Sequence, residues 1–171
     1  MNIRALTLRD LIRLAGREMN IPGSLLVERP KHWDIVILGD AEQPIESSSF
    51  GRSVRKNVDS TEKAANYLLM VTTLLRAVEE SDYRGYLLEG ELEGARVVCK
   101  DAHSFSMHGK KERVLELKLG KKDRIYFYQV NASSSPKARA ILLLMAFHKK
   151  DQRTPADVTG VCERQIRSLL A

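Results

Sequence analysis

Apolar residues recur at helical spacing in three stretches of the chain, and each stretch predicts a helix. The first opens with a capping box at Thr7–Asp10 and is expected to stop near residues 20–23. The second begins at Asp59 or Ser60 and carries one wide apolar stripe, made of Ala64, Tyr67, Leu68, Val71, Leu74, Leu75 and Val78. The third has Thr154 as N-cap and Pro155 at the first helical position, and its buried stripe is Val158, Cys162, Ile166 and Leu169.

The other apolar runs predict strands. Arg113–Leu119 and Arg124–Val130 are joined by Gly-Lys-Lys-Asp, which has the composition of a hairpin turn. Ala140–Phe147 is apolar without alternation, so we expect a central strand that is covered on both faces. Ser24–Glu28 and Trp33–Leu38 are two shorter candidates nearer the N-terminus.

Two segments fit neither pattern. Residues 40–58 are polar, with three serines at 47–49, and are predicted to form a long exposed loop. In residues 85–100 three glycines weaken a helix, while residues 95–99 could pair as a strand. The predicted fold is of the α+β class: a small, mostly antiparallel, twisted sheet packed against helices. Residues 1–58 form an N-terminal extension of a helix, short strands and a loop, and residues 59–171 form the core.

Basic residues are concentrated in the C-terminal part of the chain. The net charge of the 171 residues is +6, but residues 100–171 hold 15 Lys and Arg against 7 Asp and Glu, whereas residues 1–99 hold 13 against 15. A basic segment attached to a near-neutral scaffold is typical of proteins that bind polyanions such as nucleic acid. A well-solvated basic surface without a ligand is the alternative interpretation.

Composition also bears on where the protein acts. Cys99 and Cys162 lack metal-like spacing and predict no disulfide framework, which favours a reducing setting. The N-terminus has no signal-peptide pattern, and the longest apolar run, Ala140–Phe147, is too short to cross a bilayer. We therefore expect a cytoplasmic protein with no membrane partner.

Cationic and aromatic residues fall at matching positions on the two hairpin strands. Because side chains alternate along a strand, Lys118, Arg124 and Tyr126 are expected on one open face, opposite Leu117 and Ile125. Cations beside an aromatic ring suit RNA, since the cations bind phosphate and the ring stacks on an unpaired base. A solvated sheet face, with tyrosines as ordinary strand formers, is the competing interpretation.

Further basic residues extend this candidate site. His148, Lys149 and Lys150 follow the central strand directly and are expected at the sheet edge, where a histidine can exchange a proton near neutral pH. His103 and His108 are expected in a flexible loop. The candidates for contacts with the RNA backbone are His108, Lys110, Lys111, Lys121, Lys122 and Arg153.

Several catalytic classes lack their motifs in this chain. There is no HExxH, Gly-rich phosphate loop, GxSxG or paired-carboxylate motif, and we expect neither a metal nor a cofactor. A metal-free ribonuclease needs less, because the 2′-hydroxyl of the substrate can attack the adjacent phosphate. The protein then positions the RNA, moves protons and stabilises the charge that develops on the phosphoryl oxygens.

The same segments resemble the RelE/ParE superfamily of type II toxins, especially its phage-derived, HigB-like members. Residues 116–118 resemble the family's ELR strand motif, residues 124–126 its second strand, and residues 147–155 (FHKKDQRTP) its most specific motif. The resemblance covers about the last sixty residues. It implies a RelE-like fold, metal-free cleavage of mRNA at the ribosome by basic and aromatic residues, and a cognate helix-turn-helix antitoxin. A separate branch of the family acts on DNA gyrase.

The chain departs from the family pattern in two ways. Lys118 replaces the arginine of ELR, which keeps the charge but loses the bidentate grip on phosphate. Residues 1–58 are longer than the family's lead-in, so they form either an extra structural layer or a regulatory segment.

The first functional hypothesis is therefore a metal-free endoribonuclease that cleaves mRNA at the ribosome. Its catalytic residues would be Lys118, Arg124, Tyr126, His148, Lys149 and Lys150, and we expect Arg124 and Lys149 to be exposed. The alternative is a non-enzymatic phage or prophage accessory protein on the same fold, which binds nucleic acid or a host protein. A gyrase-directed toxin is the third option.

Overall fold

The computed structural model describes residues 2–16, 29–92, 97–130, 139–151 and 154–171. Its strands are β1 (Ile3–Ala5), β2 (Asp34–Leu38), β3 (Val97–Met107), β4 (Lys110–Leu119), β5 (Asp123–Val130) and β6 (Ala140–His148). Its helices are α1 (Leu8–Leu14), the 3₁₀ turn η2 (Ile45–Ser47), α2 (Ser49–Asn57), α3 (Thr61–Ala77), α4 (Tyr83–Leu92) and α5 (Ala156–Leu170).

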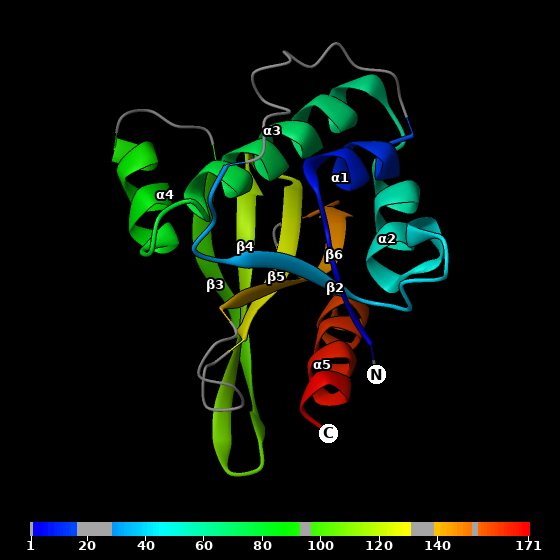
Figure 1. Ribbon diagram of the computed structural model, residues 1–171, viewed down its shortest axis with the longest axis vertical. Helices are drawn as coiled ribbons and strands as arrows, with labels where there is room; N and C mark the ends of the chain where they lie inside the picture. The colour runs from blue at the N-terminus through cyan, green and yellow to red at the C-terminus, as the bar shows by residue number, and fades with distance from the viewer. Residues whose placement is uncertain (1, 17–28, 93–96, 131–138, 152–153) are drawn as a thin grey trace.

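All the described strands belong to one six-stranded sheet in the order β1-β2-β6-β5-β4-β3. Neighbouring strands pair antiparallel except β2 and β6, which are parallel. Helices α1 to α4 lie over one face of the sheet and α5 lies over the other (Figure 1). The predicted α+β class and mostly antiparallel sheet are therefore confirmed.

Residues before 58 supply part of this sheet and of its core. β2, predicted as Trp33–Leu38, lies beside the central strand β6, with Ile35 opposite Ile141. Buried residues on both sides of position 58, among them Ile35 and Leu74, belong to the same apolar cluster. The N-terminal residues are thus packed into the sheet rather than held apart from it. The candidate strand Ser24–Glu28 lies outside the described residues.

Helix α1 begins at the predicted capping box. The Thr7 side chain accepts the Asp10 backbone N–H at 3.2 Å, and the Asp10 carboxylate accepts the Thr7 backbone N–H at 3.0 Å. The helix ends at Leu14, earlier than expected, because Gly16 takes a left-handed backbone conformation with φ of 65°. A glycine adopts this conformation at little cost, so it stops a helix well.

The predicted loop over residues 40–58 is wrong in its second half, which forms η2 and α2. The Ser48 hydroxyl caps α2 by accepting the Gly51 N–H at 2.9 Å. Only two large apolar residues of α2, Phe50 and Val54, are buried. A single i, i+4 pair on an otherwise polar segment gives too weak a periodic signal to predict a helix.

The ambiguous stretch after residue 85 contains both alternatives in succession. α4 runs from Tyr83 to Leu92 despite its glycines, and β3 begins at Val97 and continues to Met107. The flexible loop predicted for His103 and His108 is wrong, because His103 lies within β3 and His108 in a tight turn. His108 and Gly109 both have positive φ, 50° and 72°, which is the backbone that suits a two-residue hairpin.

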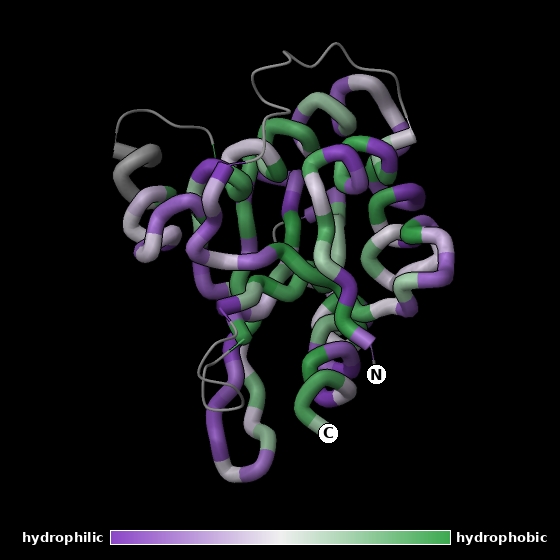
Figure 2. Tube along the Cα trace, in the orientation of Figure 1, coloured by the Kyte–Doolittle hydropathy of each residue, from purple (hydrophilic) through white to green (hydrophobic). Residues whose placement is uncertain are grey.

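The central strand β6 is buried on both faces, as its apolar sequence predicted. Ile141 and Leu143 pack on the α3 side, while Leu142 and Leu144 pack on the α5 side. Figure 2 shows hydrophobic residues gathered in the central strands. A bulge interrupts the pairing of β6 with β5: Tyr126 lies opposite Met145 and Phe127 opposite Leu143, which leaves Leu144 as the extra residue.

Strands β4 and β5 pair along only part of their length. Their register runs from Leu115 opposite Phe127 to Leu119 opposite Asp123. Beyond Leu115 the β3–β4 hairpin leaves β5 and projects from the body of the protein, as Figure 1 shows at its lower edge. The sheet therefore forks between β4 and β5.

Helix α5 covers the second face through the predicted stripe, with Val158, Cys162 and Ile166 buried. Its N-cap is Pro155 rather than Thr154, so the predicted start is one residue early. The Thr154 hydroxyl does not cap the helix but lies 3.5 Å from the Tyr126 hydroxyl. In the parts of the chain that the structure describes, no helix combines the length and the hydropathy needed to span a membrane.

Candidate functional site

The predicted site residues occupy the two opposite ends of β4. His108, Lys110 and Lys111 are exposed around the projecting hairpin turn, whereas Lys118, Lys121 and Lys122 lie at the other end, where β4 meets β5. Lys118 follows Lys110 by eight positions, which corresponds to about 26 Å along a strand. The structure therefore does not bring the two groups together.

The residues near Lys118 are divided again, between the two faces of the sheet. The α5 side carries Lys118, Arg124 and Tyr126, as the alternation predicted. Lys118 of β4 lies directly opposite Arg124 of β5, and Tyr126 follows Arg124 by two positions. On β6, Phe147 packs on the α5 side, so the next side chain, His148, lies on the α3 side. His148 lines a hollow there with Asn66 of α3.

Arg124 is buried, with 5% of its surface exposed, so the expectation that it is exposed is wrong. Its guanidinium holds the β4–β5 turn: Nη1 donates to the carbonyl oxygens of Asp123 at 2.8 Å and Gly120 at 3.2 Å, and Nη2 to that of Lys121 at 3.1 Å. Its Nε lies 3.6 Å from a carboxylate oxygen of Glu116 on the neighbouring strand. Arg124 lies on the side of the sheet that α5 covers.

Lys149 and Tyr126 are buried beside Arg124, which corrects the predictions of an exposed Lys149 and an open Tyr126. Lys149 is 6% exposed and Tyr126 is fully buried. Burial lowers the pKa of the Lys149 ammonium group, with Glu116 acting in the opposite direction. Burial also raises the pKa of the Tyr126 hydroxyl to about 12. These side chains are therefore buried rather than part of an open RNA surface.

On the α3 side, a histidine, a carboxylate and an amide form a chain of hydrogen bonds. Nδ1 of His148 lies 2.8 Å from Oδ1 of Asp123, its cross-strand neighbour. The other carboxylate oxygen of Asp123 accepts the side-chain N–H of Asn66, on α3, at 2.8 Å. Both Asp123 and His148 are partly exposed, with side-chain exposures of 14% and 26%. We call these three residues the His148 triad.

The triad lies at an open hollow of about 600 Å³. Lys121 and Lys122 of the turn line this hollow with Glu62 from the first turn of α3, and all three are exposed. The turn is held in place from β6, because the Lys149 N–H donates to the Lys122 carbonyl at 2.8 Å. The hollow thus combines a held imidazole, two carboxylates and two ammonium groups.

The remaining predicted residues lie around this group or outside the description. Lys150 is exposed at the end of β6, and Lys118 is partly exposed on the α5 side. Arg153 lies outside the described residues. Within the described ranges, no group of three or more His, Cys, Asp or Glu side chains is arranged to hold a metal ion.

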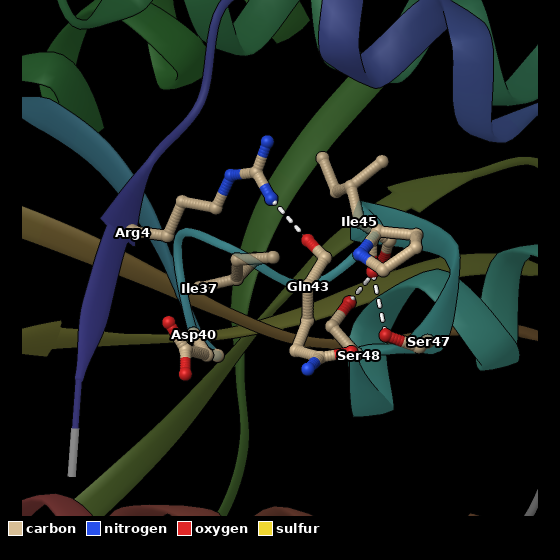
Figure 3. Close-up of a pocket in the computed structure, with 9 residues that line it drawn as sticks. Arg4, Ile37, Asp40, Gln43, Ile45, Ser47 and Ser48 are labelled. Carbon is tan, nitrogen blue, oxygen red and sulfur yellow. Dashed lines mark hydrogen bonds between the residues drawn. The ribbon is translucent and has the colours of Figure 1, made fainter.

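A smaller hollow of about 160 Å³ lies between β1 and the η2–α2 segment (Figure 3). Its polar side chains bind the protein itself. Arg4 donates to the Gln43 carbonyl at 2.8 Å, and the Ser47 and Ser48 hydroxyls each donate to a backbone carbonyl at 2.6 Å. This hollow is therefore accounted for by local structure.

Three site residues were missed by reasoning from the sequence. Asp123 was assigned only to the hairpin turn, and Glu62 and Asn66 were not singled out. The sequence does place the Asp123 carboxylate next to Arg124 and the two turn lysines. The pairing of Asp123 with His148, however, depends on the register between β5 and β6. That register cannot be read from the residues alone.

Comparison of the chain with protein-family models, with curated proteins and with solved structures found no match. The assignment of a function therefore depends on the geometry of the His148 triad and on the sequence resemblance.

Proposed function

We propose that this protein is a metal-free endoribonuclease that cleaves mRNA, at the ribosome, and that the His148 triad is its reactive centre. The observation that carries the proposal is the imidazole of His148, held by Asp123 at the rim of a hollow lined by two lysines. The resemblance of residues 147–155 to RelE-like toxins supports the same assignment. Inhibition by a helix-turn-helix antitoxin follows from that resemblance.

The triad suits His148 to proton transfer. The ionised Asp123 carboxylate accepts a hydrogen bond from the Nδ1–H group of His148. In the neutral imidazole the free lone pair is therefore on Nε2. Asn66 donates to the same carboxylate and so fixes its orientation. A histidine supported in this way acts as a general base, as in catalytic triads on unrelated folds.

The proposed step is an intramolecular transesterification of RNA. The 2′-oxygen forms a bond to phosphorus while the bond from phosphorus to the 5′-oxygen breaks. Nε2 of His148 takes the 2′-hydroxyl proton, and an ammonium group or water protonates the departing 5′-oxygen. Lys121 and Lys122 stabilise the charge on the phosphoryl oxygens. The products are a 2′,3′-cyclic phosphate and a free 5′-hydroxyl.

Arg124 and Lys149 have a supporting role in this scheme. Arg124 binds the carbonyl oxygens of residues 120, 121 and 123, and Lys149 binds that of residue 122 through its backbone. They therefore position the turn that carries Lys121, Lys122 and Asp123. They are positioning residues rather than groups that contact RNA.

The test is cleavage of a defined mRNA by purified protein, with and without translating ribosomes, read by primer extension and by analysis of the RNA ends. His148→Ala should lower the rate at least about 100-fold, which is the usual contribution of a general base. Asp123→Asn should lower it without unfolding the protein. His32→Ala is the matched control, because His32 is exposed and distant from the triad in sequence and element. Intact transcripts at high wild-type protein concentration would refute the proposal.

A non-enzymatic nucleic-acid binder is the second candidate. The observation that favours it is the burial of Arg124, Tyr126 and Lys149, three of the residues that match the toxin motifs. It predicts salt-sensitive RNA binding without cleavage, and binding that His148→Ala does not change. The same cleavage assay therefore separates the two candidates.

A further inference from the structure

A second group of hydrogen-bond donors lies in the fork between β4 and β5. Its hollow, of about 220 Å³, is lined in part by Glu112, Leu115 and Tyr128. The donors in the lining are Arg84 of α4, Lys111 and Arg113 of β4, and Gln129 of β5. We call these four residues the fork site. Arg113 is five residues from Lys118, about 17 Å along β4, and its side chain points to the opposite face. The fork site is thus separate from the His148 triad.

Two arginines of the fork site converge on one carboxylate. Arg84 Nη2 lies 3.6 Å from Oδ1 of Asp101 and Arg113 Nη1 lies 3.7 Å from Oδ2. The three side chains come from different elements, α4, β4 and β3, and each is about half exposed. The fold therefore already holds an anionic group between two guanidinium groups, at the surface, where solvent and a ligand can reach it.

Of the other lining groups, Gln129 favours an anion. The Tyr83 hydroxyl donates to Oε1 of Gln129 at 2.7 Å, which leaves the Gln129 amide N–H groups as donors. The Glu112 carboxylate also lines the hollow, where it is buried and accepts the Tyr128 hydroxyl at 2.7 Å. Three cations and an amide therefore line the hollow together with buried Glu112, and exposed Asp101 pairs with two of the cations.

We propose that the fork site binds a phosphate group, with Asp101 as the internal anion that the phosphate displaces. Arginine pairs recognise phosphate through forked hydrogen bonds, and a phosphate dianion competes well with a monovalent carboxylate on the same donors. The phosphate comes either from a nucleic-acid backbone or from a free phosphate compound, and the two sources share this chemistry. The inference does not require that the protein cleaves RNA.

Two binding measurements test the fork site. In the first, the unfolding temperature is recorded in inorganic phosphate and in chloride at the same ionic strength, since a ligand of the native state stabilises it. In the second, fluorescence anisotropy follows the binding of a labelled oligouridylate of about 12 nucleotides. The variants are Arg113→Ala, Arg113→Gln and Asp101→Asn, with Lys56→Ala on α2 as a matched loss of one exposed charge.

The variants should move affinity in opposite directions. Arg113→Ala and Arg113→Gln should weaken phosphate binding about tenfold, as expected for a charged hydrogen bond. Asp101→Asn should strengthen it by roughly two- to fivefold, because an exposed ion pair no longer competes. If the variants change the affinity for oligouridylate in the same way, the phosphate belongs to an RNA backbone. If they change only the affinity for inorganic phosphate, it belongs to a free phosphate compound.

The proposal is overturned if Arg113→Ala and Asp101→Asn bind both probes as Lys56→Ala does. Unfolding curves of each variant without ligand show that the comparison is made on folded protein, and Arg113→Gln replaces Arg113→Ala where the latter is unstable. If wild-type protein binds phosphate but does not cleave RNA, the proposed nuclease activity is contradicted and the fork site is not.

Discussion

Replacing Arg124 with alanine should destabilise the protein before it affects any chemistry. The substitution removes three hydrogen bonds to the carbonyls of the β4–β5 turn and the 3.6 Å ionic contact with Glu116. Breaking a buried ion pair by removing one partner costs about 3–5 kcal/mol. Some turn carbonyls regain water, because Gly120 and Lys121 are exposed, so we expect a loss of roughly 3–4 kcal/mol. That is a large part of the roughly 5–15 kcal/mol by which domains are stable.

Urea unfolding provides the measurement. The single tryptophan, Trp33, packs edge-on against Tyr83 with ring centroids 5.2 Å apart, so its fluorescence reports on the α3 side of the core. The double variant Arg124→Ala with Glu116→Gln should be at least about 1 kcal/mol more stable than the sum of the single losses, since the uncompensated buried charge is then gone. Arg9→Ala, at an exposed position on α1, is the control and should change stability by less than about 0.5 kcal/mol.

The reasoning would be refuted by an Arg124→Ala protein within about 0.5 kcal/mol of wild type. Arg124 would then be dispensable to the fold and available to RNA, as the sequence alone predicted. A destabilised variant that loses cleavage only in proportion to its folded fraction supports the positioning role.

Three further predictions concern the scaffold. Burial lowers the pKa of His103 below its usual 6.5, with Glu163 of α5 acting in the opposite direction, so the unfolded chain binds a proton more readily. Stability should therefore fall as pH drops below about 6.5, and His103→Phe should flatten this dependence in urea titrations at several pH values. An unchanged pH slope would contradict that assignment. Gly51→Ala would place a Cβ 2.2 Å from the Ile45 carbonyl oxygen and should cost at least about 1–3 kcal/mol in the same assay, whereas an unaffected midpoint would mean that η2 moves freely. Thr7→Ala removes the capping box and should cost about 1 kcal/mol, with no loss if α1 is held by packing alone.

Side-chain alternation predicted which residues share a face but not what covers that face. Lys118, Arg124 and Tyr126 do lie together, because a strand places every second side chain on the same side. The stripe of α5 was also predicted correctly, yet the two predictions were not combined. An amphipathic helix that follows the central strand directly must bury its stripe on a neighbouring sheet face, and the face of Arg124 and Tyr126 was the one available.

The His148 triad was beyond prediction for a different reason. It depends on the bulge at Leu144, one extra residue in β6 that shifts the following side chains to the other face. Without the bulge, His148 would lie on the α5 side with Arg124, as strict alternation implies. A long apolar run carries no polar marker that would reveal where an unpaired residue sits.

The β4–β5 turn connects the two sides of the sheet, and this explains how the toxin-like residues can matter while buried. From the α5 side, Arg124 binds three carbonyl oxygens of the turn. From the α3 side, the Asp123 side chain of the same turn holds His148. A change on the buried side therefore moves the carboxylate that orients the imidazole, without any contact between Arg124 and RNA. In the proposed enzyme, Arg124 and Lys149 act on the reaction through the turn. The groups that contact the substrate are His148, Lys121 and Lys122.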